Sequence, residues 1–139
     1  MAKTSGVATY VAIDNAAGSL QDISNDGSSV SNSSSQNLLD VTGMDKTAVE
    51  KIAGLRDNTI SMNGYYNNAA NMSNQVLSSM TGARSIDIRI GGNTQGNPRF
   101  RAEMLISSYN VEIGDDRGMT WSLTAELQDG NPGTWDTVP

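Results

Sequence analysis

The sequence predicts a mainly β protein, an antiparallel β-sandwich or part-barrel with one or two short α-helices packed against it. Several segments alternate apolar and polar residues with the period of two that a half-buried strand requires. Turn residues separate these segments at short intervals, which favours hairpin connections. The length of 139 residues suits one domain, which we expect to span residues 1–139.

The expected elements follow from local patterns along the chain. The segment 85–90 is the clearest strand, because its three isoleucines share one face and charged residues occupy the other. Strands are predicted at residues 7–13, 19–23, 38–42, 59–66, 85–90, 99–113 and 121–127, and helices at 46–53 and 72–80.

The helix expected at 46–53 rests on its end signals. Asp45 can cap its N-terminus, Met44 and Val49 fit a hydrophobic staple, and Gly54 suits the left-handed stop. In the predicted strand 99–113 the apolar parity changes near Ser107, which indicates a β-bulge.

Residues 24–37 consist almost entirely of Ser, Asn, Asp and Gly, with Val30 as their one apolar residue. Such a segment cannot by itself bury enough apolar surface to offset the entropy of ordering it. We weigh two interpretations, a flexible surface loop and an extended hairpin arm that orders only against a neighbour. The C-terminal tail, residues 129–139, is rich in turn residues and is expected on a surface.

Composition removes several classes of function. The chain has no cysteine and no histidine, which excludes disulfides, thiolate zinc sites and histidine-dependent catalysis. Its net charge is -6, and its nine basic residues are scattered, which disfavours a protein that grips nucleic acid. No apolar run reaches the length of a membrane span, and the N-terminus lacks a signal peptide pattern, so we expect a cytoplasmic site of synthesis.

Motifs that could carry chemistry are weak. The glycine-rich loop 91–96 lacks the lysine and the following helix of a phosphate loop. Asp115 and Asp116 lie in a turn between glycines, without the ligand spacing of a calcium site. We therefore predict no enzyme, no cofactor and no metal, and rank a carboxylate-based enzyme last.

Four arginines lie on or beside two neighbouring predicted strands. They could form a small basic patch, or they could pair across strands with Asp87, Glu103 and acids of a neighbouring subunit. The negative net charge favours pairing. The arginines are Arg84, Arg89, Arg99 and Arg101.

Several phrases occur in an order that resembles the tail tube (major tail) protein family of siphovirus-type long-tailed bacteriophages. The likeness extends over nearly the whole chain, and no phrase is a catalytic signature. The phrases are QNLLDVT (36–42), EKIAGL (50–55), TISMNG (59–64), IGGN with GNP (90–93 and 96–98), MLISSY (104–109) and DGNPGTW (129–135).

The resemblance implies a β-sandwich whose inner sheets join into a ring barrel, with hexameric rings that stack into a tube. The tube would surround a tape measure protein, meet terminator and baseplate or distal tail proteins, and conduct DNA without binding it specifically. It would form in the host cytoplasm and end in the virion tail, with no membrane insertion of its own. An inter-ring arm would contain Ser28, Val30, Asn32 and Ser34, and acids that could face the lumen are Asp22, Asp40, Asp87 and Glu103.

Two other functions remain open. The chain could be the tube protein of a contractile injection or secretion system, which would need a surrounding sheath. It could also be a monomeric β-sandwich that binds a glycan or peptide, which needs an exposed aromatic platform. Trp135 is the candidate for that platform.

Overall fold

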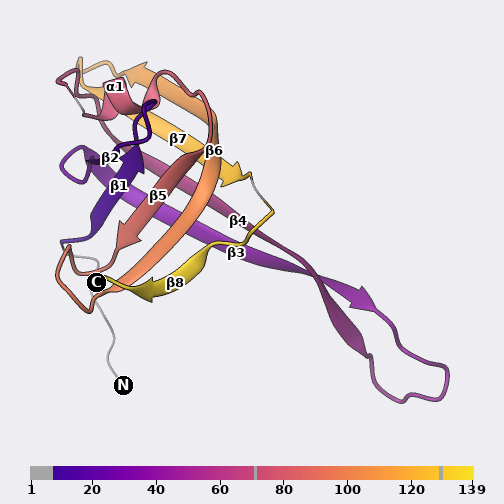
Figure 1. Cartoon of the computed structure of the whole chain (residues 1–139). Coiled ribbons are helices and arrows are strands. Elements are labelled where there is room, and N and C mark those ends of the chain that lie inside the picture. Colours follow the sequence, from indigo (N-terminus) through magenta and orange to yellow (C-terminus); the bar gives the residue numbers. More distant parts are fainter. Residues whose placement is uncertain (1–7, 71, 129) are drawn as a thin grey trace.

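The computed structural model describes residues 8–70, 72–128 and 130–139. These residues form one eight-stranded, antiparallel sheet, which is not closed into a barrel, and one short helix, so the predicted fold class is confirmed (Figure 1). Residue 7 of the first predicted strand lies outside the described residues. The elements are β1 (Tyr10–Asp14), β2 (Leu20–Asp22), β3 (Gly27–Asp40), β4 (Lys51–Tyr65), α1 (Ser73–Leu77), β5 (Arg84–Arg89), β6 (Pro98–Ile113), β7 (Met119–Leu127) and β8 (Thr134–Thr137).

The strand order is β2-β1-β5-β6-β7-β4-β3, and β8 pairs with β6 beside this path. Strand β6 belongs to two layers, because its first half pairs with β5 and β8 and its second half pairs with β7. The pairing register shifts between Ile106 and Ser108, which confirms the predicted bulge. We call β2, β1, β5, residues 98–104 of β6 and β8 the first layer, and residues 105–113 of β6 with β7, β4 and β3 the second layer.

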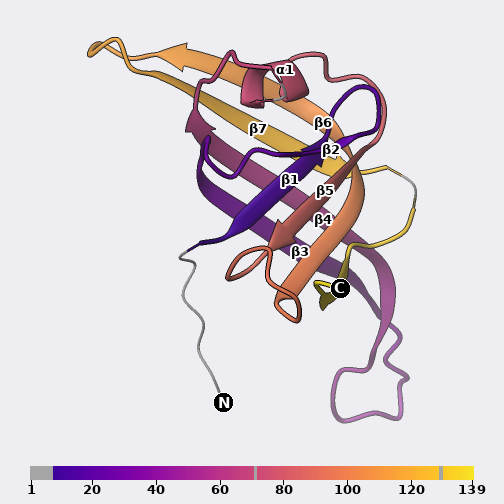
Figure 2. The ribbon, with the colours of Figure 1, turned by 60° about the vertical axis from the view of Figure 1, so that its left-hand side comes forward.

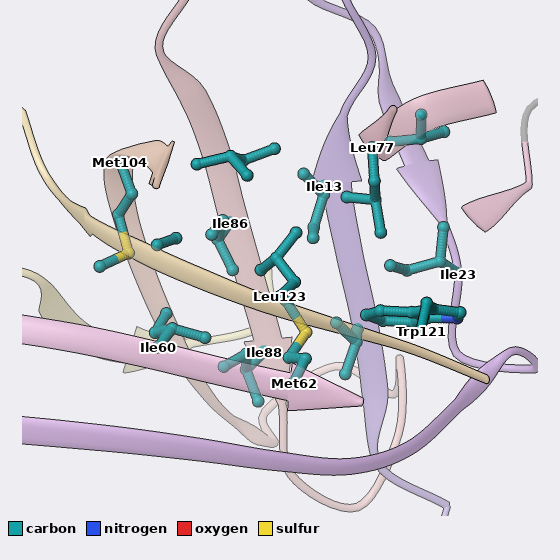
Figure 3. Packing of buried hydrophobic residues seen from close by; sticks show 14 of the residues in the cluster. Ile13, Ile23, Ile60, Met62, Leu77, Ile86, Ile88, Met104, Trp121 and Leu123 are labelled. Carbon is teal, nitrogen blue, oxygen red and sulfur yellow. The ribbon is translucent and has the colours of Figure 1, made fainter. Parts of the chain in front are cut away.

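The hydrophobic core lies between the two layers, where alternate residues of each strand point inward (Figure 3). Trp121 of β7 is almost fully buried, and its indole N–H donates to the carbonyl of Tyr65 at 2.9 Å. Each large apolar side chain buried in this way contributes roughly 1.5–3 kcal/mol. The core includes Val11, Ile13, Ile23, Ile60, Met62, Val76, Leu77, Ile86, Ile88, Phe100, Met104, Ile106, Trp121 and Leu123.

A buried carboxylate fixes the start of α1, which is shorter than the predicted helix at 72–80. Asp26, just before β3, accepts hydrogen bonds from the backbone N–H of Ser73 and from the side-chain amide of Asn67, both at 3.0 Å. Its own carbonyl accepts the N–H of Tyr65 at 2.7 Å. This one residue therefore joins the end of β4, the following loop and the helix.

A buried guanidinium fixes the end of α1. Arg84 is 1% exposed and has no carboxylate partner among the described residues. It donates instead to the carbonyl oxygens of Val76 (2.8 Å), Asp14 (2.9 Å) and Thr81 (2.9 Å), and to the hydroxyl of Ser79. The predicted pairing of this arginine with an acid is therefore wrong, and its role is to satisfy backbone carbonyls around the helix end.

The predicted helix at 46–53 is wrong. Residues 41–50 form the tip of a long hairpin, and β4 begins at Lys51. The flexible-loop interpretation of residues 24–37 is also wrong, because β3 covers most of this segment and pairs with β4 of the same chain from Gly27↔Gly64 to Asp40↔Lys51. Pairing along its whole length supplies the hydrogen bonds that the polar sequence could not obtain alone.

The tail contributes a strand that the sequence analysis did not predict. Strand β8 pairs with the first half of β6, and the Arg99 guanidinium there binds both carboxylate oxygens of Asp136 at 2.8 Å. The ring of Trp135 lies 5.3 Å from that of Phe100, centroid to centroid. Gly133 lies so close to Phe100 that an added Cβ would be 2.1 Å from the ring. Only glycine fits this crossing of backbone over an aromatic ring.

Candidate assembly surfaces

The β3–β4 hairpin extends well beyond the body of the protein (Figure 1). Strand β7 pairs with β4 only from Thr59 onward, so the preceding residues of the hairpin have no third strand beside them. We call residues 36–56 the arm; all of them are exposed except the half-buried Gly54. Figure 2 shows the arm and the β6–β7 hairpin at opposite ends of the molecule.

The arm carries apolar side chains on both of its faces. Leu39 pairs with Ile52, and the neighbouring Leu38 pairs with Ala53, so the two pairs point to opposite sides. A soluble monomer rarely leaves such a surface uncovered, which marks the arm as a contact site. Its exposed large apolar residues are Leu38, Leu39, Val41, Met44, Val49, Ile52 and Leu55, with exposed fractions from 45% to 107%.

The base of the arm tip is fixed by a small polar network. The carboxylate of Asp40 accepts the hydroxyl of Thr42 at 2.6 Å and its N–H at 3.0 Å, and both bonds hold the pKa of Asp40 below its usual value. The same hydroxyl accepts the N–H of Glu50 at 2.8 Å across the hairpin. These bonds make the tip of the arm a defined turn, although no third strand of the described residues lies beside the arm.

The outward face of the second layer is covered with small polar residues. The register places alternate residues of β3, β4, β7 and β6 in rows across this face, for example Ser31, Ser61 and Thr124. Its acids are Asp57, Glu112 and Glu126. Among the outward positions of these four strands, which are described in full, there is no lysine or arginine. The other positions are Ser29, Ser31, Ser33, Ser35, Thr59, Ser61, Asn63, Tyr65, Leu105, Ser108, Asn110, Thr120, Ser122 and Thr124. We call this surface the hydroxyl face.

The outward face of the first layer is charged and contains both signs. Asp87 and Arg89 of β5 form an ion pair at 2.9 Å, and the Arg89 guanidinium stacks over the Tyr10 ring at 4.8 Å. Arg89 does pair with an acid, but within its own strand and not across strands or subunits as expected, and Arg99 pairs with the tail residue Asp136. The arginines of this face are thus largely neutralised within the chain.

A groove of about 740 Å³ lies where the sheet does not close, between the start of β3 and strands β1 and β5. Its lining is apolar and hydroxyl-bearing, and none of its residues has an ionisable side chain. The described residues contain no cluster of three acidic side chains that could hold a metal ion. No helix in the described part is long and apolar enough to cross a membrane. The groove is therefore suited to packing and not to acid–base chemistry.

Nearly the whole chain superposes on subunits of solved tail structures. A subunit from the tail of an empty gene transfer agent (GTA) particle, refined with C6 symmetry, matches with a TM-score of 0.77 and 14% identity over 99% of this chain and 100% of that chain. A subunit of the SPP1 tail tube matches with a TM-score of 0.74 and 10% identity over 97% and 80%. The chain has the tail-tube fold.

A further match is a subunit of the virion of a native GTA particle, with a TM-score of 0.70 and 13% identity over 93% of this chain and 95% of that chain. No protein-family model and no curated protein sequence matches the chain. The tail-tube fold is therefore established by structure, at sequence identities of 10% to 14%.

Within the tail-tube fold, the four residues predicted for an inter-ring arm lie in the body and not in the arm. Val30 packs against the core, and Ser34 accepts a 2.6 Å hydrogen bond from the buried Asn58. Ser28 and Asn32 share their parity on β3, and both line the groove. The projecting part of the hairpin begins only after them, at residue 36.

Three of the four predicted lumen acids share one surface of the tail-tube fold. Asp22, Asp87 and Glu103 all lie on the outward face of the first layer, where Ala12 pairs with both aspartates. Asp87 is 3% exposed, whereas Asp22 and Glu103 are exposed. Asp40 lies on the arm, so the four acids do not form one group.

Sequence reasoning missed the apolar residues of the arm. Val41, Met44 and Val49 lie in the tip of the hairpin, outside any strand or helix, and are exposed. The predicted helix paired Met44 with Val49 as a hydrophobic staple, so an exposed contact surface was not expected there. It also missed the hydroxyl face, which needs the register of four strands to become visible.

Proposed function

We propose that this protein is the structural subunit of a tail tube, and that it self-assembles into stacked rings, six copies to a ring. The proposal is supported by the superposition on tail structures over almost the full chain, one of them refined with C6 symmetry. The observation that carries it in this chain is the arm, an ordered hairpin with exposed apolar residues on both faces and no third strand beside it among the described residues.

In this proposal the arm reaches a neighbouring ring and buries its apolar side chains there. Head-to-tail contacts of this kind generate a ring when the rotation closes and a filament when rings stack. The lumen would hold a tape measure protein during assembly and later conduct DNA, and the ends of the tube would meet terminator and baseplate proteins. The protein would assemble in the host cytoplasm, become part of the virion tail, and catalyse no reaction.

The test is assembly of the purified chain with and without its arm. Gln36 and Arg56 are register partners, so an Asn-Gly turn can join them directly in place of residues 37–55. We expect the parent chain to form tubes of even width in negative-stain images at high concentration. The shortened chain should keep its thermal unfolding temperature within about 2 °C and form no tubes, because the arm does not stabilise the body. A parent chain that stays monomeric at every concentration would contradict the proposal.

One observation favours a second function, a monomeric glycan- or peptide-binding module. Trp135 is 56% exposed and lines the groove. Under that function a Trp135→Ala variant would lose binding to a glycan or peptide array while the parent chain stays monomeric. Tube formation by the Trp135→Ala variant, with no ligand bound by either chain, would favour the tail tube.

A further inference from the structure

The β6–β7 hairpin carries a second apolar surface, apart from the arm. Val111, Ile113 and Met119 lie on the same side of the sheet as the buried Trp121. Their exposed fractions run from 37% to 65%, although Trp121, the cross-strand partner of Val111, is almost fully buried. The cover of the core therefore ends between these two partners. We call Val111, Ile113 and Met119 the hairpin patch.

The hairpin patch is continuous. Ile113 and Met119 are register partners, and Val111 lies two residues before Ile113 on the same face. Single exposed apolar residues are ordinary on a soluble protein, whereas adjacent ones mark a contact surface. Strand β4 pairs with β7 only as far as Thr120, so Met119 lies just beyond the end of the third strand. The patch is thus suited to a partner outside its own chain.

The arm and the hairpin patch lie at opposite ends of the second layer (Figure 2). Strand β4 begins in the arm, where Ile52 pairs with Leu39, and ends at Tyr65. Tyr65 pairs with Thr120, the neighbour of Met119. The distance along β4 from residue 52 to residue 65 is roughly 40 Å, at about 3.3 Å per residue. The arm of one copy therefore cannot cover the hairpin patch of the same copy.

Stacking brings these two ends together. In the proposed tube every ring faces the same way, so the arm end of one ring meets the opposite end of the next ring. That opposite end carries the hairpin patch. Both surfaces are apolar, and contact between them removes both from water. The occupant that the geometry favours is therefore the arm of a second copy.

Charge disfavours the other pairing, in which two hairpin patches meet. The exposed rim of the patch is acidic, because Glu112, Asp115 and Asp116 outnumber Arg117. Two such rims would repel each other. The arm, by contrast, contains three acidic and three basic residues within 36–56 and has no net charge. An acidic rim therefore accepts the arm more readily than a second copy of itself.

One face of the arm suits an apolar contact better than the other. Leu38 and Ala53 share their face with the charged register partners Asp40 and Lys51. Burying that face would remove two charges from water, which is costly. The pair Leu39 and Ile52 lies on the opposite face. This second face is the one that can be covered without desolvating Asp40 and Lys51.

We propose that the arm face with Leu39 and Ile52 packs on the hairpin patch of a copy in the neighbouring ring. This inference rests on the proposed function and identifies the surface that receives the arm. Each copy then contacts one neighbouring ring through its arm and the other through its hairpin patch. The first and last rings of a tube therefore expose different surfaces.

Disulfide cross-linking tests this contact, and the absence of cysteine in the chain gives a clean background. One chain carries Ile52→Cys on the arm together with Ile113→Cys or Met119→Cys on the hairpin patch. A disulfide needs Cα atoms within about 7 Å, whereas these sites are roughly 40 Å apart within one copy. Any disulfide between them therefore joins two copies.

Oxidised tubes should give a ladder of cross-linked products with at least one of the two pairs. The matched control replaces Ile52→Cys with Ala53→Cys, on the other face of the arm. A second comparison joins Ile52→Cys with Ser28→Cys in the groove. Tubes without a ladder for either Ile52 pair, or with an equal ladder from Ala53 or Ser28, overturn the proposal and leave the tail tube function standing. A parent chain that forms no tubes overturns the proposed function, and this contact with it.

A double-mutant cycle measured by pelleting gives an independent readout. The patch variant, Ile113→Ser with Met119→Ser, should raise the critical concentration for assembly roughly tenfold or more, because it removes exposed apolar area from the contact. Combining it with Leu39→Ser and Ile52→Ser on the arm should give a rise well below the product of the two separate rises, since both sets of changes remove the same contact. An unchanged critical concentration in the patch variant, or a combined rise equal to that product, overturns the proposal.

Discussion

The exposed apolar side chains of the arm allow us to estimate how much a substitution raises the critical concentration for assembly. Leu39 and Ile52 are cross-strand partners with exposed fractions of 46% and 50%. Full burial of such a side chain contributes roughly 1.5–3 kcal/mol, so covering the exposed half of each contributes about 1 kcal/mol. Replacing both with serine should therefore weaken assembly by about 2 kcal/mol per subunit. Because 1.4 kcal/mol corresponds to a factor of ten, the critical concentration should rise roughly 30-fold.

The assay is pelleting by ultracentrifugation over a range of concentrations, with thermal unfolding of the unassembled protein measured in parallel. The melting temperature should change little, because these side chains lie on the arm, beyond the part of β4 that pairs with β7. Leu20→Ser is the matched control, since Leu20 is 42% exposed on β2, away from the arm. A rise of less than threefold in the double variant, or an equal rise in the control, would refute the assignment of the arm as the contact site.

Three further predictions concern the subunit itself. Arg84→Met should lower the free energy of unfolding by about 3 kcal/mol, because three backbone carbonyls lose a buried charged donor. Urea denaturation measures this change, and a loss below about 1 kcal/mol would contradict the prediction. The Arg99 guanidinium holds the pKa of Asp136 below its ordinary value. The Asp136 carboxylate therefore contributes its full stabilisation above the unfolded pKa of about 3.9, and this stabilisation is lost as the pH falls through the lower folded pKa. The parent chain should lose this part of its stability on acidification, and Asp136→Asn should not. Gly64→Ala should destabilise the fold by at least about 2 kcal/mol, because its Cβ would lie 1.9 Å from a facing carbonyl oxygen, whereas Gly27→Ala, with 3.9 Å of space, should cost less than about 1 kcal/mol.

The sequence predicted the strands that contribute to the core, because their alternation records which side is buried. The segment 85–90 corresponds to β5, and the change of parity near Ser107 corresponds to the bulge that lets β6 serve both layers. In both places the local pattern and the tertiary environment require the same residue types, so the prediction holds.

Prediction failed where partners distant in sequence decide the structure. The end signals at Asp45 and Gly54 are those of a helix, but pairing of residues 51–53 with 38–40 makes the segment part of a hairpin. The serine-rich β3 becomes a strand because β4 supplies its hydrogen bonds, which no window of the sequence can indicate. Strand β8 was missed because turn residues surround it, and its position depends on Gly133 fitting against Phe100.

The candidate site was also predicted only in part. The sequence indicated that a hairpin arm exists, but it placed the arm in the segment 24–37 and not at residues 36–56. Pairing of Arg89 with an acid was predicted across strands or subunits, whereas its ion pair with Asp87 joins alternate positions of one strand. The role of Arg84 could not be predicted, because its partners are backbone carbonyls of β1 and of residues 76–81, together with the Ser79 hydroxyl, and not an acid.

The arm projects from one end of the molecule only, and this polarity has a consequence for growth. In the proposed tube, a ring that docks by its arms presents a fresh set of arms or receiving surfaces, identical to those it has just used. Addition of the hundredth ring is then energetically the same as addition of the tenth. In the proposed tube the arm contact therefore sets no length, so any fixed length of the polymer has to be imposed by another molecule.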